Sequence, residues 1–324
     1  MTVLTEPSAD TAAPLPLAGW HLELEITGNC QLACTHCYAE SSPLGGHGTM
    51  TLQDWQTLIS RAAAHGVSSI QLIGGEPTRH PNFAELLGHA IDVGLEVEVY
   101  TNLYQVKEAW WHLLSRPGVT LATSYYSDQA AEHDQVTYRT GSHARTRANI
   151  AEAVRRGIPI RAGIIDTRHG QRVGQARAEL EALGVADVWI DRVRGVGRAT
   201  AALPDVSQLC GGCGRGQAAI SPDGDVWACV LSRWMTPAGN VKTADLADIL
   251  HSPRWQHLVD AIPPRCPHAK CDPDKGCDPD KGGCRPKADG GDCSPAERTA
   301  CNPKLFCNPN QQVTDPKKPE RPKK

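Results

Sequence analysis

Three cysteines fall within eight residues of this chain. Cys30, Cys34 and Cys37 have the spacing CxxxCxxC and directly follow the alternating apolar and polar residues of HLELEIT. A structural zinc site usually takes four protein ligands, often from two CxxC-type pairs. Three thiolates instead suit a [4Fe–4S] cluster whose fourth iron stays open to another ligand. The pattern therefore favours an iron–sulfur cluster, with a zinc site or a redox thiol cluster as the alternatives.

The remaining cysteines point to metal binding more than to disulfides. The chain has 324 residues, 13 of them cysteine, and ten of these lie beyond residue 209. The N-terminal segment carries Glu6 and Asp10 and lacks the apolar core of a signal peptide, and no run approaches ~18 apolar residues. We therefore expect a cytoplasmic protein with no membrane partner, in which clustered cysteines bind metal. The formal net charge of -3 argues against a nucleic acid partner.

An alternation of strand-like and helix-like segments sets the place of the three cysteines. It is typical of βαβ units and a parallel sheet. We predict strands at Trp20–Thr27, Ser69–Ile73, Leu95–Thr101, Val119–Ser124, Ile158–Ile165 and Val188–Val193. We predict helices at Leu52–His65, Phe83–Val93, Val106–Ser115, His143–Arg156 and Arg172–Leu183. Six such repeats form an open doubly wound sheet or a partial barrel, and in both the chemistry lies at the carboxyl ends of the strands, where the cysteine loop begins.

The sequence changes character after about residue 200. AISPDGDVWACV predicts a hairpin that turns at Pro222–Asp225, and Thr243–His251 predicts one short helix. Beyond Pro263 the chain is rich in Cys, Pro, Gly, Asp and Lys, and CDPDKG occurs twice. We therefore divide the chain into a disordered N-terminus (1–19), an α/β core (20–200), a small cysteine-rich domain (201–307) and a disordered basic tail (308–324).

The first cysteine motif resembles that of the radical S-adenosylmethionine (SAM) superfamily. Gly74-Gly75-Glu76-Pro77, at the end of the second predicted strand, resembles the GGEP motif of the same family. The resemblance implies an α/β fold, a partial (β/α)6 TIM-like barrel, in which Cys30, Cys34 and Cys37 hold the catalytic cluster. It also implies that Glu76 binds the ammonium group of SAM, while the two glycines let the backbone approach the cofactor closely.

Four more residues stand at positions where the family contacts SAM. His36 replaces the aromatic residue that usually lies near adenine, and Asn102 in YTNL partly matches the family's TNG. Ser124 aligns with a serine that contacts the ribose, although the usual SxDG is SYYS here. HDQVTYRTGS resembles the family's HDxxR segment, which makes Arg139 a candidate for the SAM carboxylate. From the residues alone, Ser124 and Arg139 could equally be a strand-end hydroxyl and a surface cation.

The later cysteines resemble a SPASM domain, the auxiliary-cluster module of peptide-modifying radical enzymes. Gly224 and Cys229 reproduce its Gly-x4-Cys opening, and a wider-spaced run of cysteines resembles its closing pattern. The resemblance implies two auxiliary [4Fe–4S] clusters, with one cluster and an open site as the alternative. The first would be held by Cys210, Cys213, Cys229 and Cys284, and the second by Cys266, Cys271, Cys277 and Cys293. Cys301 and Cys307 are then left over.

The chemistry implied by the resemblance is reductive cleavage of SAM to a 5′-deoxyadenosyl radical, which abstracts hydrogen from a substrate carbon. We expect a ribosomally made peptide to be crosslinked, oxidised or epimerised. The alternatives are a small-molecule (aminoglycoside or other natural-product) epimerase or dehydrogenase, a sulfatase-maturase-like protein oxidase, and a non-enzymatic iron–sulfur or zinc scaffold. We expect an electron donor such as flavodoxin or ferredoxin as a partner. Only 19 residues precede the first strand, so we also expect either a separate leader-peptide-binding protein or a small natural product as substrate.

Overall fold

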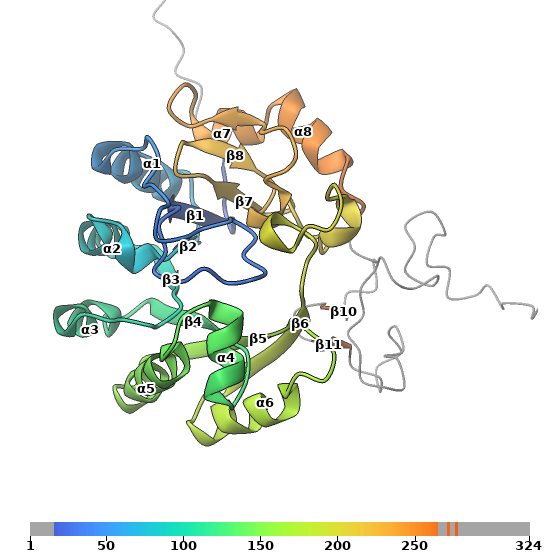
Figure 1. Cartoon of the computed structure of the whole chain (residues 1–324). Coiled ribbons are helices and arrows are strands. Elements are labelled where there is room, and N and C mark those ends of the chain that lie inside the picture. The colour runs from blue at the N-terminus through green and yellow to red at the C-terminus, as the bar shows by residue number, and fades with distance from the viewer. Residues whose placement is uncertain (1–15, 265–270, 273–275, 278–324) are drawn as a thin grey trace, which may run out of the picture.

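The computed structural model of the chain describes residues 16–264, 271–272 and 276–277. Nine strands form one sheet in the order β6-β5-β4-β3-β2-β1-β7-β8-β9, which is strongly curved (Figure 1). They are β1 (His21–Thr27), β2 (Ser69–Gly74), β3 (Glu96–Tyr100), β4 (Val119–Tyr125), β5 (Ile160–Asp166), β6 (Asp187–Arg192), β7 (Gln217–Ile220), β8 (Asp225–Trp227) and β9 (Gly239–Asn240). Neighbours from β6 to β7 are parallel, and β7, β8 and β9 are antiparallel. Among the described residues no pairing joins β6 to β9, so the barrel is partial, as predicted.

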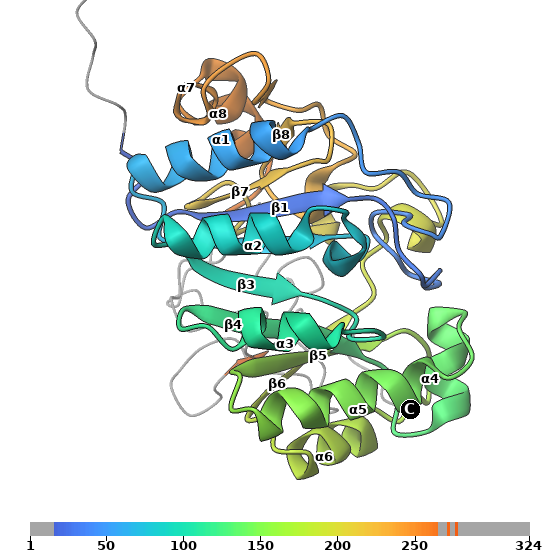
Figure 2. The same ribbon diagram turned by 90° about the vertical axis from the view of Figure 1, so that its left-hand side faces the viewer.

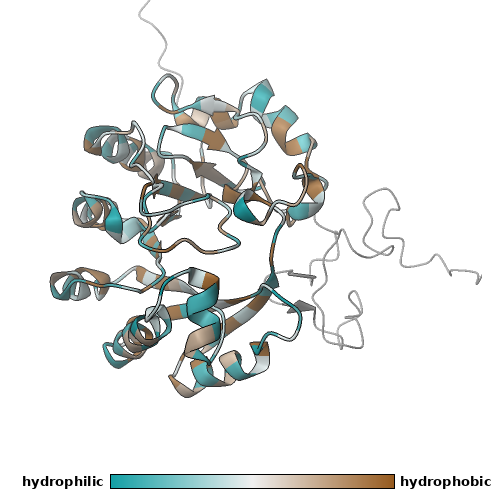
Figure 3. Ribbon diagram, in the orientation of Figure 1, coloured by the Kyte–Doolittle hydropathy of each residue, from teal (hydrophilic) through white to brown (hydrophobic). Residues whose placement is uncertain are grey.

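Most of the helices cover the outer face of the sheet (Figure 1 and Figure 2). The described helices are α1 (Leu52–Ala64), α2 (Phe83–Asp92), α3 (Glu108–Leu114), α4 (Ala130–Thr137), α5 (Ser142–Arg155), α6 (Val173–Ala182), α7 (Leu246–Leu250) and α8 (Pro253–Asp260). Figure 2 shows α1, α2, α3 and α5 in front of the strands, and in Figure 3 α5 and α6 each mix apolar and polar stretches, as helices with one buried face do. The five predicted helices and six predicted strands are confirmed, each end within two residues of its prediction, whereas α4 was not predicted.

The two faces of the sheet differ in chemistry, because successive side chains of a strand point to opposite sides. On β1, Leu22, Leu24 and Ile26 are fully buried in the core, while Glu23 and Glu25 alternate with them. A closed parallel barrel usually fills its interior with branched aliphatic side chains. Here the inner face of the neighbouring strands is largely polar and lines a cavity; its side chains include Gln71, Tyr100, Ser124, Arg161, Trp189 and Asp191.

The predicted hairpin is confirmed, and it extends the main sheet. β7 pairs in parallel with β1, from His21 opposite Gln217 to Leu24 opposite Ile220, and β8 returns beside β7. The sheet therefore continues past residue 200 into the cysteine-rich region. Thr243–His251, predicted as one helix, contains α7.

Several predictions fall outside the described residues. These are the ligands Cys266, Cys284 and Cys293, the leftover Cys301 and Cys307, the tail 308–324 and residues 1–15. Cys271 and Cys277 are described through their backbone, where β10 (Cys271–Asp272) and β11 (Gly276–Cys277) pair antiparallel with these two cysteines opposite each other. In the part of the chain that the structure describes, no helix is long and apolar enough to cross a membrane.

Candidate functional site

One cavity gathers most of the predicted site residues. It has a volume of about 390 Å³ and is bounded by the cysteine loop after β1 and by the inner face of strands β1 to β7. Eleven predicted residues line it: Cys30, Cys34, His36, Cys37, Gly74, Gly75, Asn102, Ser124, Cys210, Cys213 and Cys229. Glu76, Pro77 and Arg139 do not line it. The sequence thus predicted the position of the cavity but not all of its walls.

The cysteine loop is held from two sides by backbone hydrogen bonds. The N–H of Cys30 donates to the carbonyl of Ser42 (3.0 Å). On the other side, Ala33 and Thr35 donate to the carbonyls of Thr137 and Val136 at the end of α4 (3.1 and 3.0 Å). α4, which was not predicted from the sequence, therefore anchors the loop that carries Cys30, Cys34 and Cys37.

The three thiols suit a cluster better than a single metal ion. All three are free cysteines on the same cavity. Burial raises the pKa of Cys30 well above its usual range and that of Cys34 to about 12, so both need a bound cation to become thiolates. Among the described residues, no three His, Cys, Asp or Glu side chains are grouped as the ligands of one metal ion would be. Three cysteines are fewer than the four ligands that a structural zinc site usually takes, whereas in a [4Fe–4S] cluster each cysteine binds a different iron.

A segment after β6 docks on the cysteine loop, and sequence reasoning missed it. Arg198, in the short helix η2 (Gly197–Ala199), donates from Nε to the carbonyl of Cys34 (2.8 Å) and from Nη2 to that of Ser41 (2.6 Å). Its backbone N–H donates to the carbonyl of Cys37 (3.0 Å). A Cβ on Gly197 would lie 2.3 Å from the carbonyl oxygen of Tyr38, so only glycine permits this approach. Arg198 thus fixes the loop and adds a positive charge beside it.

The turn at residues 74–77 brings backbone to the cavity, as expected of two glycines. Gly74 has a φ of 124°, and a Cβ on Gly75 would lie 2.4 Å from the carbonyl oxygen of Asn29. The side chain of Asn29 is itself fixed: its amide donates to the carbonyls of Pro43 and Gly45 (3.1 and 2.8 Å). The turn and the cysteine loop are therefore packed backbone to backbone.

Glu76 lies behind this turn, fully buried. Its Oε1 accepts hydrogen bonds from Thr78 N (3.1 Å), Thr78 Oγ1 (2.6 Å) and Thr101 Oγ1 (2.7 Å), and its Oε2 accepts one from Asn102 N (2.8 Å). Burial raises the pKa of Glu76, against these hydrogen bonds, which favour the carboxylate. The carboxylate thus joins the ends of β2 and β3, and the predicted contact with the SAM ammonium stays a prediction.

Asn102 links that carboxylate to the first cysteine. Its Nδ2 donates to the sulfur of Cys30 (3.6 Å), and its Oδ1 accepts from Gln31 and from the N–H of Tyr104 (3.1 and 2.9 Å). A hydrogen bond to a sulfur ligand tunes the potential of a cluster. If Cys30 binds a cluster as predicted, Asn102 would donate a hydrogen bond to one of its sulfur ligands.

Aromatic residues form another wall. His36 is largely buried and meets the ring of Tyr126 edge-on, with centroids 5.2 Å apart. Burial lowers the pKa of His36 to about 4, so the imidazole is neutral at pH 7. Ser124 hydrogen-bonds Tyr100 (3.1 Å) at the end of β4. A neutral imidazole beside the ring of Tyr126 suits a planar base, and the hydroxyl of Ser124 on the same cavity suits a sugar, so the adenine and ribose contacts of His36 and Ser124 stay predictions.

Arg139 lies on the outer side of the same region. It is exposed, and its Nε donates to the hydroxyl of Tyr104 (3.1 Å). Asp134, of the same HD segment, accepts hydrogen bonds from Gly141 N, Ser142 Oγ and His143 N and thereby holds the first turn of α5. The segment that resembles HDxxR therefore has a local structural role, because its Asp134 fixes the first turn of α5.

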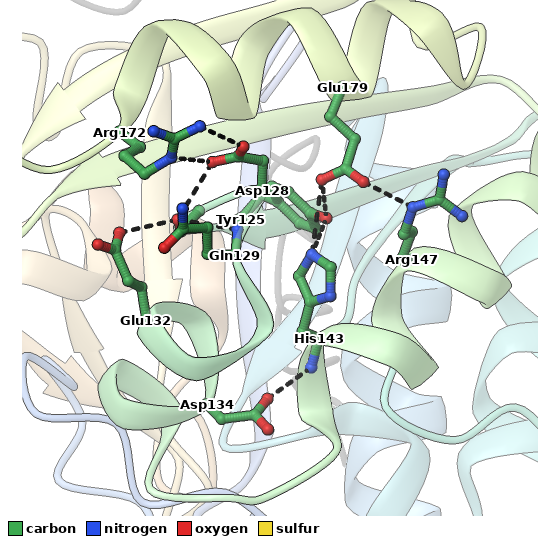
Figure 4. Close-up of polar contacts among 10 residues, drawn as sticks. Tyr125, Asp128, Gln129, Glu132, Asp134, His143, Arg147, Arg172 and Glu179 are labelled. Atoms are coloured by element: carbon green, nitrogen blue, oxygen red, sulfur yellow. Dashed lines mark hydrogen bonds and ion pairs between the residues drawn. The ribbon is translucent and has the colours of Figure 1, made fainter.

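A polar network beneath β4 supports this part of the wall. Tyr125 bonds to His143 (2.8 Å) and to Glu179 (2.7 Å), and Arg147 pairs with Glu179 (2.6 Å), as Figure 4 shows. These contacts tie β4 to α5 and α6. The start of α4 is fixed nearby by the ion pair between Arg172 and Asp128 (2.8 Å) (Figure 4). The end of β4, where Ser124 lies, is therefore rigidly supported.

The second cysteine set opens on the same cavity as the first. Cys213 and Cys229 are buried with their sulfur atoms 3.0 Å apart, and Cys210 is partly buried beside them. The pairing of β7 with β1 brings them there, because it places the hairpin on the edge of the barrel. Sequence spacing could not predict this, since the approach depends on a strand pairing across almost 200 residues.

A charged pair on the inner face was also missed. Arg161 on β5 reaches Glu98 on β3 with two hydrogen bonds, Nε to Oε2 (2.6 Å) and Nη2 to Oε1 (2.7 Å). Burial acts to raise the pKa of Glu98, but Arg161 outweighs it and holds that pKa below its usual value. The alternation of β3 could have indicated Glu98, which is a charge between the buried Val97 and Val99. The burial along β5 does not alternate and gave no such signal for Arg161.

Comparison with known families agrees with this site. Residues 24–173 match the model of the radical SAM superfamily, and residues 210–277 match that of an iron–sulfur cluster-binding domain, SPASM. The first region contains Cys30, Cys34 and Cys37, and the second begins at Cys210.

Individual proteins and solved structures are similar to this chain as well. The antilisterial bacteriocin subtilosin biosynthesis protein AlbA of Bacillus subtilis is 26% identical over 82% of this chain and 67% of its own. A PqqA peptide cyclase of Ruegeria pomeroyi is 31% identical over 49% of this chain and 42% of its own length, so the match spans less than half of that relative. The crystal structure of Streptococcus suis SuiB bound to precursor peptide SuiA superposes with a TM-score of 0.63 at 15% identity, covering 80% of this chain and 69% of that one, which shows a common fold.

Proposed function

The chain belongs to the radical SAM superfamily, with SAM and [4Fe–4S] clusters as its cofactors, and from this we propose that it modifies a ribosomally made peptide. The observation that carries the proposal is the shared cavity. Cys30, Cys34 and Cys37 line it together with Cys210, Cys213 and Cys229. A substrate held there lies between two cysteine sets, which suits a reaction that abstracts hydrogen and later removes an electron.

The chain's own residues position the cofactors. Cys30, Cys34 and Cys37 would hold the catalytic cluster, which together with SAM supplies a carbon radical that removes a hydrogen atom from the substrate. The backbone at Gly74 and Gly75 would receive the amino acid end of SAM, while His36 and Ser124 would receive its adenosine end. Arg198 and Asn102 would hold the loop and its first sulfur in place.

The auxiliary site would use Cys210, Cys213 and Cys229 with a fourth ligand from later in the chain, Cys284. A second auxiliary cluster would use Cys266, Cys271, Cys277 and Cys293. The backbone pairing of Cys271 with Cys277 supports the two acting in one site, because it brings the two positions opposite each other.

A peptide is favoured as substrate by the form of the cavity and by the relatives. Among the described residues no strand pairing closes the barrel between β6 and β9. The inner face offers charged and hydrogen-bonding groups rather than an aliphatic core. Two of the reported relatives are named for a bacteriocin and for a peptide, and the superposed structure holds a precursor peptide. We propose an oxidoreductase reaction: a crosslink, an oxidation or an epimerisation.

The first test uses the chain reconstituted with iron and sulfide without oxygen. Incubated with dithionite and SAM, it should release 5′-deoxyadenosine, whereas a variant with Cys30, Cys34 and Cys37 all changed to Ala should not. The substrate test adds peptides encoded by short reading frames beside this gene. Mass spectrometry should show loss of two hydrogens for a crosslink or oxidation, or solvent deuterium uptake for an epimerisation. Turnover of a small natural product with unchanged peptides would refute the peptide proposal.

A further inference from the structure

This inference rests on the proposed function, because a radical SAM reaction needs one electron delivered to the catalytic cluster from outside. Tyr104 is the buried residue that connects the cysteine loop to the surface. It packs against Cys30 and Leu32, with Cys34 beside them, and is 8% exposed. Its hydroxyl accepts the hydrogen bond from Arg139.

Two exposed arginines lie over this tyrosine. The guanidinium of Arg145 is 4.8 Å from the ring centroid of Tyr104, and that of Arg139 is 5.3 Å from it. Within the described residues, neither guanidinium makes an ion pair. Most other arginines of α5 and α6 do, among them Arg147 and Arg155. The pair over Tyr104 is therefore an uncompensated positive site on a chain whose net charge is -3.

An exposed aromatic residue completes the surface. Tyr138, at the end of α4, is 72% exposed and has a φ of 53°, in the left-handed region that a tyrosine rarely adopts. The two residues before it, Val136 and Thr137, accept the backbone hydrogen bonds from the cysteine loop. Tyr138 thus projects outward at the place where α4 touches the loop. Tyrosine and arginine are the residues enriched at protein interfaces.

We propose that Tyr138, Arg139 and Arg145 form the docking surface for an acidic electron-carrier protein, such as a flavodoxin. The two cations would steer an acidic partner, and Tyr138 would provide the apolar contact. The docked carrier loses one electron and the catalytic cluster gains it, across Tyr104 and without any bond made or broken. The three residues are exposed, and none of them lines the cavity where the substrate is proposed to bind.

The test measures the rate at which a reduced, acidic recombinant flavodoxin reduces the reconstituted chain, followed by the loss of cluster absorbance. Wild type is compared with Arg145→Glu, with Arg139→Glu/Arg145→Glu and with the matched control Arg155→Glu, which makes the same charge change at the far end of α5. At low salt the double variant should be slower by about tenfold or more, since charge steering raises association rates by that factor. The rate of wild type should also fall as salt is added, and that of the double variant should not.

Dithionite supplies the control for structural damage. It is small and needs no docking surface, so it should reduce all variants at one rate, and their iron content should be equal. A double variant that flavodoxin reduces as fast as wild type would overturn the proposal. A loss of iron or of dithionite reduction would also overturn it, because it would mean that the arginines hold the cysteine loop. The variant Arg139→Gln/Arg145→Gln removes the charges without reversing them. It separates that result from poor folding of the Glu variant. A wild type that takes up electrons from flavodoxin but releases no 5′-deoxyadenosine would refute the proposed function and leave the docking comparison intact.

Discussion

At the scale of single residues, Glu76 shows how a motif residue can act through its neighbours. Its carboxylate accepts hydrogen bonds from the ends of two strands and holds the backbone of Asn102, whose side chain contacts the sulfur of Cys30. In Glu76→Gln, one orientation of the amide would place its NH₂ group against the N–H of Asn102. The other orientation would place the NH₂ group against Thr78 N, Thr78 Oγ1 and Thr101 Oγ1, the three donors that bond Oε1. We expect a loss of about 3 kcal/mol in the free energy of unfolding, the usual effect of removing a buried, charge-assisted hydrogen bond. Urea unfolding of the cluster-free chain measures it.

The same variant decides between two roles for Glu76. If the carboxylate only supports the turn, Glu76→Gln should lose stability, while any change in SAM affinity should be small once the chain is folded. If it binds the SAM ammonium, as the motif implies, affinity should fall about tenfold or more with cluster content normal. Glu85→Gln, a substitution of an acidic residue in the first turn of the following helix, is the matched control.

Glu25 gives a pH-dependent prediction. It is 1% exposed on β1, and burial raises its pKa to about 7, although Arg233 lies 3.3 Å away and opposes the shift. The folded chain therefore holds a proton that the unfolded chain releases near its usual pKa of 4.5. Stability should fall as the pH rises from about 4.5 to 7, by about 3 kcal/mol, and then level off. Urea midpoints across this range should lose that slope in Glu25→Gln; the same slope in the variant would exclude Glu25 as its source.

At the scale of elements, the repeating pattern was predictable because each unit must bury one face. Leu22, Leu24 and Ile26 alternate as a strand does, and the predicted helices carry apolar residues at helical spacing. α4 was not predicted because it is short and mostly polar, and because part of its segment resembles the HDxxR motif. The pairing of β7 with β1 escaped because local pattern cannot specify which distant strand lies at an edge. The role of Arg198 was not predicted for the same reason, since its hydrogen-bond partners are backbone carbonyls more than 150 residues away in the sequence.

The short helix η2 should be needed to hold the cysteine loop. Gly197 touches the carbonyls of Cys37 and Tyr38, so a methyl group there forces the two segments apart. We expect Gly197→Ala to assemble less catalytic cluster and to lose more than 1 kcal/mol of stability. Gly174→Ala is the matched control, because Gly174 lies in α6 with nothing within 4 Å of an added Cβ, and it should be neutral or slightly stabilising. Equal cluster content in the two variants would show that η2 does not support the loop.

At the scale of the whole molecule, the continuous sheet brings the two cysteine sets to one cavity. β1 leads into the loop of Cys30, Cys34 and Cys37, and its neighbour β7 leads through the hairpin to Cys229. Movement of either region would change the distance between the two cysteine sets, so the pairing of β1 with β7 fixes that distance. If each set of three cysteines binds its own cluster, as proposed, total iron is a direct measure of how many clusters the chain assembles.

We therefore expect about twelve irons per chain, from one catalytic and two auxiliary [4Fe–4S] clusters. Changing Cys30, Cys34 and Cys37 to Ala should remove about four and leave the auxiliary irons in place, and changing Cys210, Cys213 and Cys229 should remove a different four. A chain ending at Ser294 should keep the full number, because Cys301 and Cys307 are assigned no iron, and its circular dichroism should be that of the intact barrel. Iron analysis with Mössbauer spectroscopy counts the clusters. A truncation that loses four irons would make Cys301 or Cys307 a ligand, and a wild-type total near eight would mean that the duplicated CDPDKG segment, with Cys271 and Cys277, binds no cluster of its own.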